Sequence, residues 1–174
     1  MPSVSTPGGG GTAEHRPEQA RTDYAGAIYG ALLAASVIAG TAAVGPFSRL
    51  GLVLFLLVTG VVFWAAHVYA RLAGERAHGQ LLSWGEVRHV ATHEWPVVQA
   101  AVPPAVAVAI SPLLRLGLAG TAWFALGVAL FEQVMWSTVA AVRAGASRRL
   151  VVVSGLVNLA LGLIIVVAKT TIHH

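Results

Sequence analysis

The sequence predicts an all-α, polytopic transmembrane helical bundle of five spans, and three observations lead to that class. Hydrophobic residues make up 56% of the chain and charged residues only 10%, and the mean hydropathy is +0.74. A soluble domain carries about 25% charged residues, because its surface must meet water. Long apolar stretches recur along the chain, and most of the arginines lie between them. A surface that faces hydrocarbon accounts for all three observations.

Five apolar stretches have the length of a membrane span. Crossing a hydrocarbon core of ~30 Å takes about 17–25 helical residues. The predicted spans cover approximately residues 25–44, 52–70, 97–114, 119–142 and 150–168. We interpret residues 23–174 as a single transmembrane domain. Residues 1–22 are rich in Pro, Gly, Ser and Thr, and we expect a disordered cytoplasmic tail because they bring too few apolar groups to fold.

The third stretch differs from the others because Pro103 and Pro104 lie in its middle. Two successive prolines remove backbone donors and clash with the preceding helical turn. A kinked span is tolerated where neighbouring helices satisfy the freed carbonyls. The alternative is a re-entrant segment, which leaves four full spans.

The distribution of basic residues predicts the orientation. With five spans and a cytoplasmic N-terminus, eight of the 11 basic residues lie inside. These are Arg16, Arg21, Arg71, Arg76, Arg88, Arg143, Arg148 and Arg149. Arg49, Arg115 and Lys169 lie outside, and the inverted topology reverses the ratio. Since Lys and Arg accumulate in cytoplasmic loops, we expect a protein of the cytoplasmic membrane with its C-terminus outside.

The connector between the second and third stretches predicts a short amphipathic helix over residues 83–94. Ser83 and Glu86 have the spacing of a capping box. At 100° per residue one face carries Trp84, Val87, Ala91 and Trp95. Glu86, His89 and His93 share the other face. A helix lying in the membrane interface accounts for both faces.

Those three polar residues are also a weak candidate metal or pH-sensing face. His89 and His93 are one turn apart, and Glu86 adds a third ligand of a kind that zinc accepts. The order of residues departs from the His-Glu-x-x-His pattern of zinc proteases, so that mechanism is not indicated. A solvated polar face is the simpler interpretation.

Glu132, near the middle of the fourth stretch, is the leading candidate for an intramembrane site. An acidic residue at the centre of a span costs about 2.5–3.5 kcal/mol on insertion scales, so it must pair, be protonated or face the bundle interior. Asn158 in the fifth stretch lies at a similar depth, and we expect a hydrogen bond between the two side chains. Ser154, Gly155, Asn158 and Gly162 form a small and polar stripe suited to close helix packing.

His67 lies one turn inside the cytoplasmic end of the second stretch. It could titrate near neutral pH and pass protons inward, or simply bond to headgroups or a neighbouring helix within the aromatic belt of Trp64 and Tyr69. Gly26 and Gly30 form a Gly-x-x-x-Gly pair that allows close helix approach or dimerisation.

Several function classes have no support. The chain has no cysteine, which excludes disulfides and thiolate metal sites. The basic residues are scattered rather than clustered, so nucleic-acid binding is not indicated. We find no nucleophile–base pair and no phosphate-binding loop. We therefore expect no enzyme activity and no cofactor.

Four segments together resemble a family of small, uncharacterised integral membrane proteins of actinobacteria. They are IYGALLAASVIAG, FWAAHVYARLAGERAHG, LSWGEVRHVATHEWPVVQAAVPP and NLALGLIIVVAK. The resemblance covers residues 24–174 and implies the topology. It implies no activity, and it assigns no functional residue.

Three functions remain as hypotheses. The first is a structural or accessory protein of the lipid bilayer that packs with itself or with a partner membrane protein. The second is a small proton- or cation-conducting protein that uses Glu132, with His67 at its inner mouth. The third is a metal- or pH-sensing cytoplasmic helix.

Overall fold

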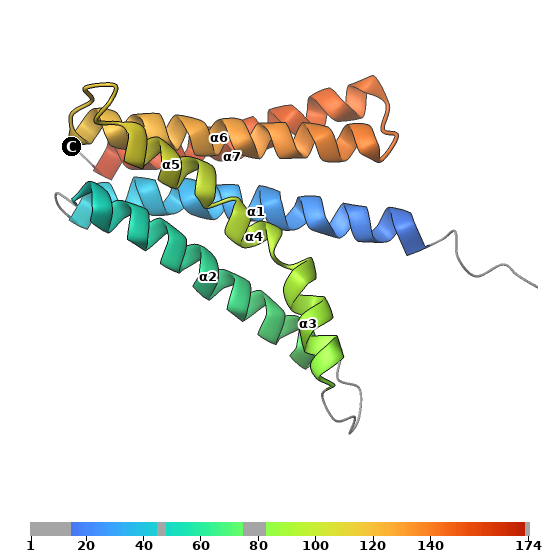
Figure 1. Cartoon of the computed structure of the whole chain (residues 1–174). Helices are drawn as coiled ribbons and strands as arrows, with labels where there is room; N and C mark the ends of the chain where they lie inside the picture. Colours follow the sequence, from blue (N-terminus) through green and yellow to red (C-terminus); the bar gives the residue numbers. More distant parts are fainter. Residues whose placement is uncertain (1–14, 45–47, 75–82, 173–174) are drawn as a thin grey trace, which may run out of the picture.

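The computed structural model describes residues 15–44, 48–74 and 83–172, and within these ranges the chain forms seven helices and no strand (Figure 1). The helices are α1 (His15–Val44), α2 (Arg49–Gly74), α3 (Trp84–His93), α4 (Pro96–Gln99), α5 (Val102–Ile110), α6 (Leu118–Arg143) and α7 (Arg148–Ile172). The predicted all-α bundle is confirmed.

Four of the helices are long and apolar enough to cross a membrane. Their qualifying segments are Tyr24–Thr41, Arg49–Gly74, Leu118–Arg143 and Arg148–Thr171. Each agrees with a predicted span to within a few residues. The predicted third span over 97–114 is interrupted in the structure, because α4 and α5 are separate short helices in this region.

The pair α4–α5 nevertheless runs from one end of the bundle toward the other. The rings of Trp95 and Trp64 lie 5.6 Å apart before α4. After α5, Ser111 accepts a hydrogen bond from Arg49 at the opposite end of α2. The chain therefore passes along the bundle five times in alternating directions (Figure 1), and it does not turn back here as a re-entrant segment would.

The break between α4 and α5 follows from the proline pair. Proline is tolerated in the first turn of a helix, whose N–H groups have no helical partner. Pro103 and Pro104 accordingly occupy the first turn of α5, and Ala100 and Ala101 form a turn before it. Because the two prolines have no N–H, they cannot bond to the carbonyls of residues 99 and 100.

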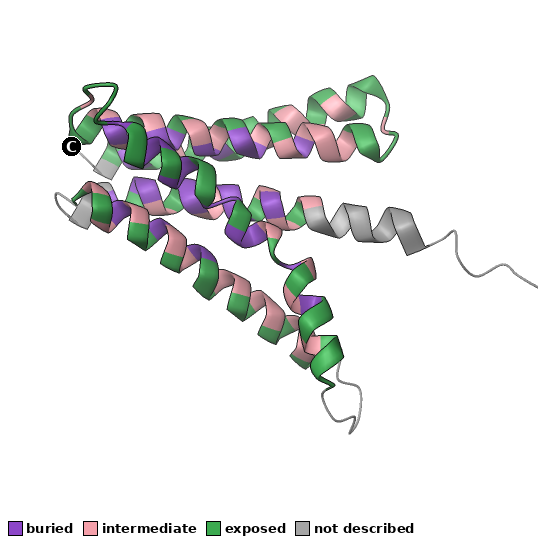
Figure 2. Cartoon of the chain, viewed as in Figure 1, coloured by how far each residue is buried: buried purple, intermediate pink, exposed green. Residues whose placement is uncertain are grey.

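The core lies where α1 and α6 meet, with α5 beside them (Figure 2). Its fully buried side chains include Ala35, Ile38, Val108, Ala125, Leu126 and Ala129. In the membrane-length segment of α1, 44% of the residues are buried, against 6% in α7. Helix α1 is thus central, whereas α7 presents leucines and valines outward, as hydrocarbon contact requires.

Close packing of α1 against α4 depends on Gly30. A Cβ atom there would lie 2.7 Å from the carbonyl oxygen of Val97 and 2.8 Å from the Cβ of Ala100. Gly26 faces the same helix. The Gly-x-x-x-Gly pair therefore packs two helices of the same chain together.

The predicted tail and connector need two corrections. Helix α1 begins at His15, so residues 15–22 are helical rather than disordered, as their mostly helix-favouring types allow. Residues 1–14 lie outside the described residues. The predicted helix over 83–94 is confirmed as α3, but the Ser83 side chain makes no capping hydrogen bond. Backbone bonds from residues 86 and 87 to the Ser83 carbonyl begin the helix instead.

Candidate functional site

Glu132 lies buried at mid-length of α6. Eleven residues separate it from Arg143 at the end of the helix, which is about 16 Å at 1.5 Å per residue. Only 6% of the residue is exposed. The indole nitrogen of Trp136, one turn later, donates a hydrogen bond of 3.1 Å to Oε1. The other oxygen, Oε2, is buried and has no hydrogen-bond partner.

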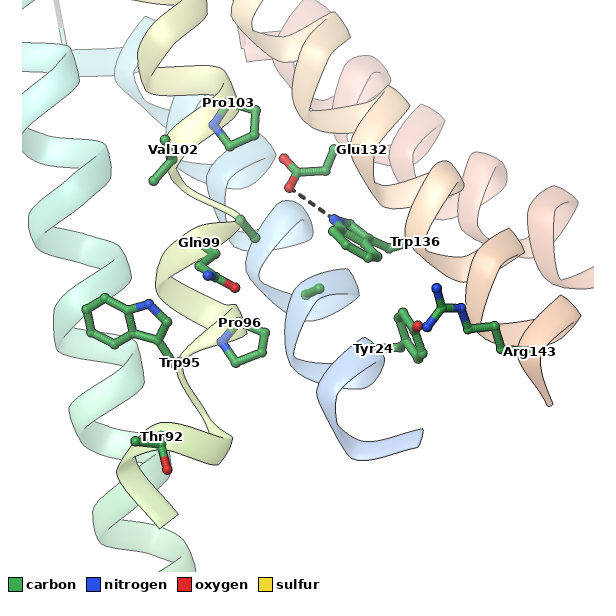
Figure 3. Close-up of a pocket in the computed structure, with 12 residues that line it drawn as sticks. Tyr24, Thr92, Trp95, Pro96, Gln99, Val102, Pro103, Glu132, Trp136 and Arg143 are labelled. Atoms are coloured by element: carbon green, nitrogen blue, oxygen red, sulfur yellow. Dashed lines mark hydrogen bonds between the residues drawn. The ribbon is translucent and has the colours of Figure 1, made fainter. Parts of the chain in front are cut away.

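The carboxyl group faces a cavity of about 930 Å³ (Figure 3). Helices α1, α3, α4, α5 and α6 and the turn before α4 supply its walls, which include the side chains of Tyr24, Trp95, Gln99, Pro103 and Trp136. Pro103 lies across the cavity from Glu132 (Figure 3). The cavity therefore combines one acidic group, aromatic rings and the α4–α5 break at the depth of the bundle midpoint.

The cavity reaches the end of the bundle where α6 stops and α3 joins α4. Thr92 and Arg143 line it at that end. The guanidinium carbon of Arg143 lies 5.8 Å from the centre of the Tyr24 ring, an arrangement that holds the cation against an aromatic face. The centres of the Tyr24 and Trp136 rings are 5.8 Å apart. A positive group and a ring pair thus flank the approach to Glu132.

Beyond Glu132, toward the opposite end, the bundle is closed. The next turns of α6 contribute Ala129, Leu126 and Ala125, each no more than 1% exposed. Ile38 and Val108 pack against them with no exposed surface. Apolar side chains therefore separate Glu132 from that far end of the protein.

The predicted hydrogen bond between Glu132 and Asn158 is wrong. The neighbouring residue, Gln133, faces α7 and donates from Nε2 to the backbone oxygen of Asn158 at 3.1 Å and to its Oδ1 at 3.3 Å. Successive helical residues differ by about 100° in direction, so one of two adjacent side chains can face α7 while the other faces the cavity. The small stripe of α7 does face α6, since a Cβ at Gly162 would lie 2.6 Å from Leu130.

His67 lies apart from Glu132. Its Nδ1 is 2.9 Å from the backbone oxygen of Phe63, and its ring centre is 5.1 Å from that of Tyr29. It does not line the cavity. The structure thus gives His67 local partners between α2 and α1, and does not bring it together with the carboxyl group.

The candidate metal face is not assembled as a site. The rings of His89 and His93 stack 6.3 Å apart, centre to centre. Within the described ranges, no three His, Cys, Asp or Glu side chains form a group able to hold a metal ion, and Glu86 is exposed.

Sequence reasoning missed the cavity-lining residues Tyr24, Gln99 and Trp136. One signal was present for Trp136, because an indole four residues after a buried acid can reach it along the same helix face. Tyr24 and Gln99 come from other helices, and nothing in their local sequence points to Glu132.

No known protein family matches the chain, and neither a curated protein nor a solved structure is significantly similar to it. The resemblance to actinobacterial membrane proteins stays a prediction.

Proposed function

We propose that this protein spans the cytoplasmic membrane and binds a cation or a proton at Glu132, which it carries across the bilayer. The observation that supports this function most strongly is the unpartnered oxygen of a buried carboxyl group that lines a cavity. An acidic side chain at the centre of a span is costly unless something compensates its charge. A bound proton or cation compensates it.

The closed region beyond the cavity favours a carrier over a pore. Apolar side chains of α1, α5 and α6 fill the path from Glu132 to the far end. A cation that has reached Glu132 from the near end can continue only if these helices rearrange. The break between α4 and α5 is one place where a wall of the cavity can change direction without disrupting a continuous helix.

The arginine distribution supports a cavity that opens toward the cytoplasm. Arg71, Arg143, Arg148 and Arg149 lie at the end of the bundle where the cavity opens. Basic residues near the ends of spans favour the cytoplasmic side. The natural absence of cysteine makes a direct test simple. In intact cells, a membrane-impermeant maleimide should label Ser48→Cys, and should label Ser147→Cys only after permeabilisation.

Transport is tested in proteoliposomes that enclose a pH-sensitive dye. Wild-type protein should dissipate an imposed proton or cation gradient faster than empty liposomes. Glu132→Gln should lower the protein-dependent rate to the background, whereas Glu86→Gln, which changes an exposed carboxyl on α3, should retain it. Wild-type protein that dissipates no gradient, or a Glu132→Gln variant as fast as wild type, would refute the proposal.

An accessory role is the weaker candidate. Its sequence motif was the Gly26–Gly30 pair, and both glycines pack against α4 of the same chain. The prediction that the chain has no enzyme activity stays a prediction.

A further inference from the structure

We infer that the cavity beside Glu132 accepts a hydrophobic organic cation, an ammonium or phosphonium compound with apolar substituents. This inference rests on the proposed function and specifies the cation. It depends on three features of the cavity: its size, its aromatic walls and its single buried acidic group.

The size of the cavity exceeds what a proton or metal ion needs. Its volume of about 930 Å³ is comparable with pockets for drug-sized ligands, which span roughly 300–1,000 Å³. Moreover, an alkali or alkaline-earth ion requires several oxygen ligands around it. Among the described side chains that line the cavity, only Glu132 carries a carboxylate.

The aromatic walls suit a cation whose charge is spread under apolar groups. Tyr24, Trp95 and Trp136 all line the cavity, one on each of three different segments. The negative face of an aromatic ring attracts an organic cation, and the attraction strengthens where water is excluded. Trp136 also donates a hydrogen bond to Glu132, so one of these aromatic rings lies directly beside the carboxylate.

The charged groups that line the cavity favour an organic cation over an organic anion. Glu132 lies at mid-length of α6 with one oxygen that has no hydrogen-bond partner, and Arg143 lies at the end of α6, where its guanidinium carbon is 5.8 Å from the centre of the Tyr24 ring. An organic anion could pair with Arg143, but the buried carboxylate of Glu132 would repel it. An organic cation finds its attractive partner in that carboxylate.

The apolar access also fits such a ligand. Val102 and Pro103 line the cavity and are exposed on the surface of the bundle. They belong to α5, and the outer surface of the α4–α5 pair faces hydrocarbon in the proposed topology. A hydrophobic cation partitions into the membrane and can reach the cavity from there, which a strongly hydrated ion cannot do.

The test is equilibrium dialysis of purified protein against labelled tetraphenylphosphonium. Its matched control is tetraphenylborate, an anion of similar size and shape. We expect one phosphonium ion per chain and no saturable binding of the borate. Glu132→Gln should weaken phosphonium binding at least tenfold. Trp136→Leu should weaken it severalfold, and Trp84→Leu, which removes an 81% exposed tryptophan outside the cavity, should not.

Each outcome decides the inference. Equal binding of the two probes, or phosphonium binding unchanged by Glu132→Gln and Trp136→Leu, would show a merely apolar groove and overturn it. Displacement of the probe by added phosphatidylethanolamine would assign the cavity to lipid, and likewise overturn it. If Glu132→Gln fails to fold, Trp136→Leu and Tyr24→Leu provide the same comparison.

The result also separates this inference from the proposed function. Proton or metal-ion flux that depends on Glu132, without phosphonium binding, would retain the transport function and reject the organic cation. Phosphonium binding that depends on Glu132, without any flux, would support the binding site and reject transport.

Discussion

Two polar regions within the bundle differ in whether their polar groups have hydrogen-bond partners in the protein. At one end, Arg49 donates to the hydroxyl of Ser111 at 3.2 Å and to the carbonyl of Leu116 at 2.6 Å. Thr121 donates to the same hydroxyl at 2.9 Å, and Ser111 donates to the carbonyl of Val108 at 2.8 Å. At mid-depth, Glu132 has one hydrogen bond and one buried oxygen without any, beside a cavity.

The difference separates polar residues that hold the fold from those available to a ligand. In the Arg49 region the side chains of Arg49, Ser111 and Thr121 all find partners in the protein, and these hydrogen bonds tie α2 to the loop between α5 and α6. An unsatisfied buried polar group costs free energy, so each one in a folded protein calls for an explanation. The Glu132 cavity has such a group together with space for a ligand.

The largest expected effect tests the Arg49 side of this comparison. Arg49→Leu removes two hydrogen bonds from a charged, half-buried donor and leaves the Leu116 carbonyl without that partner. We expect the free energy of unfolding to fall by about 3 kcal/mol, measured by thermal unfolding in mild detergent. Phosphonium binding at 20 °C should be unchanged.

Arg115→Leu is the control for Arg49→Leu. It removes an exposed arginine from the same end of the bundle, and it should change stability by less than about 0.5 kcal/mol. If the two variants unfold alike, the hydrogen bonds of Arg49 contribute nothing beyond its charge, and the contrast between the two regions fails.

The second prediction concerns a substitution that should displace α4, which is one wall of the cavity, and leave the Arg49 region unchanged. Gly30→Ala places a Cβ against the backbone of α4, which must shift. We expect a loss of about 2 kcal/mol, typical of overpacking, together with weaker phosphonium binding.

Gly40→Ala is the matched control in the same helix. A Cβ at Gly40 meets nothing within 4 Å, so the substitution should stabilise α1 slightly through helix propensity, by up to about 1 kcal/mol. If both substitutions changed phosphonium binding equally, the α1–α4 contact would have no specific influence on binding in the cavity.

The third prediction is that a substitution in the Glu132 region raises the free energy of unfolding, whereas the substitution in the Arg49 region lowers it. Glu132→Gln replaces a buried carboxylate that lacks one partner with a neutral amide of the same shape. We expect the free energy of unfolding to rise by about 1 kcal/mol while cation binding is lost, because functional groups are commonly kept at a cost in stability. A fall in stability as large as that of Arg49→Leu would mean that Glu132 also holds the fold.

Most of the fold could be predicted because hydropathy reports directly on the helices that meet lipid. The predicted spans 52–70 and 119–142 lie within α2 and α6. The exact break in the third pass could not be read from Pro103 and Pro104 alone. The prolines indicate lost donors, but a helix can accommodate them by starting just before them, which moves the break to residues 100 and 101.

The site could be predicted only in part, because depth along a helix does not give direction around it. Glu132 was identified from its cost in the membrane, and it does face a cavity. Its supposed partner was wrong, since Asn158 at the same level meets Gln133 instead. The cavity itself arises because α3 and α4 diverge from α6 (Figure 1), a tertiary feature without a local sequence signal.

The smallest effect concerns Gln133 and Asn158, which form a third polar contact between α6 and α7. Gln133 is fully buried, yet its Oε1 has no hydrogen-bond partner, so the pair is intermediate between the Arg49 region and Glu132. Hydrogen bonds between membrane helices contribute on average about 0.6 kcal/mol. A double-mutant cycle of Gln133→Leu and Asn158→Leu should give a coupling energy near that value.

The cycle is informative because Gln133 and Glu132 are adjacent but face different helices. If the Gln133–Asn158 contact only packs α6 against α7, both single variants should bind phosphonium like wild type, while Glu132→Gln does not. A loss of binding in Asn158→Leu would mean that α7 helps to position the carboxyl group through Gln133. The region that holds the fold and the region that binds the cation would then overlap on α6, rather than lie on separate faces of the helix.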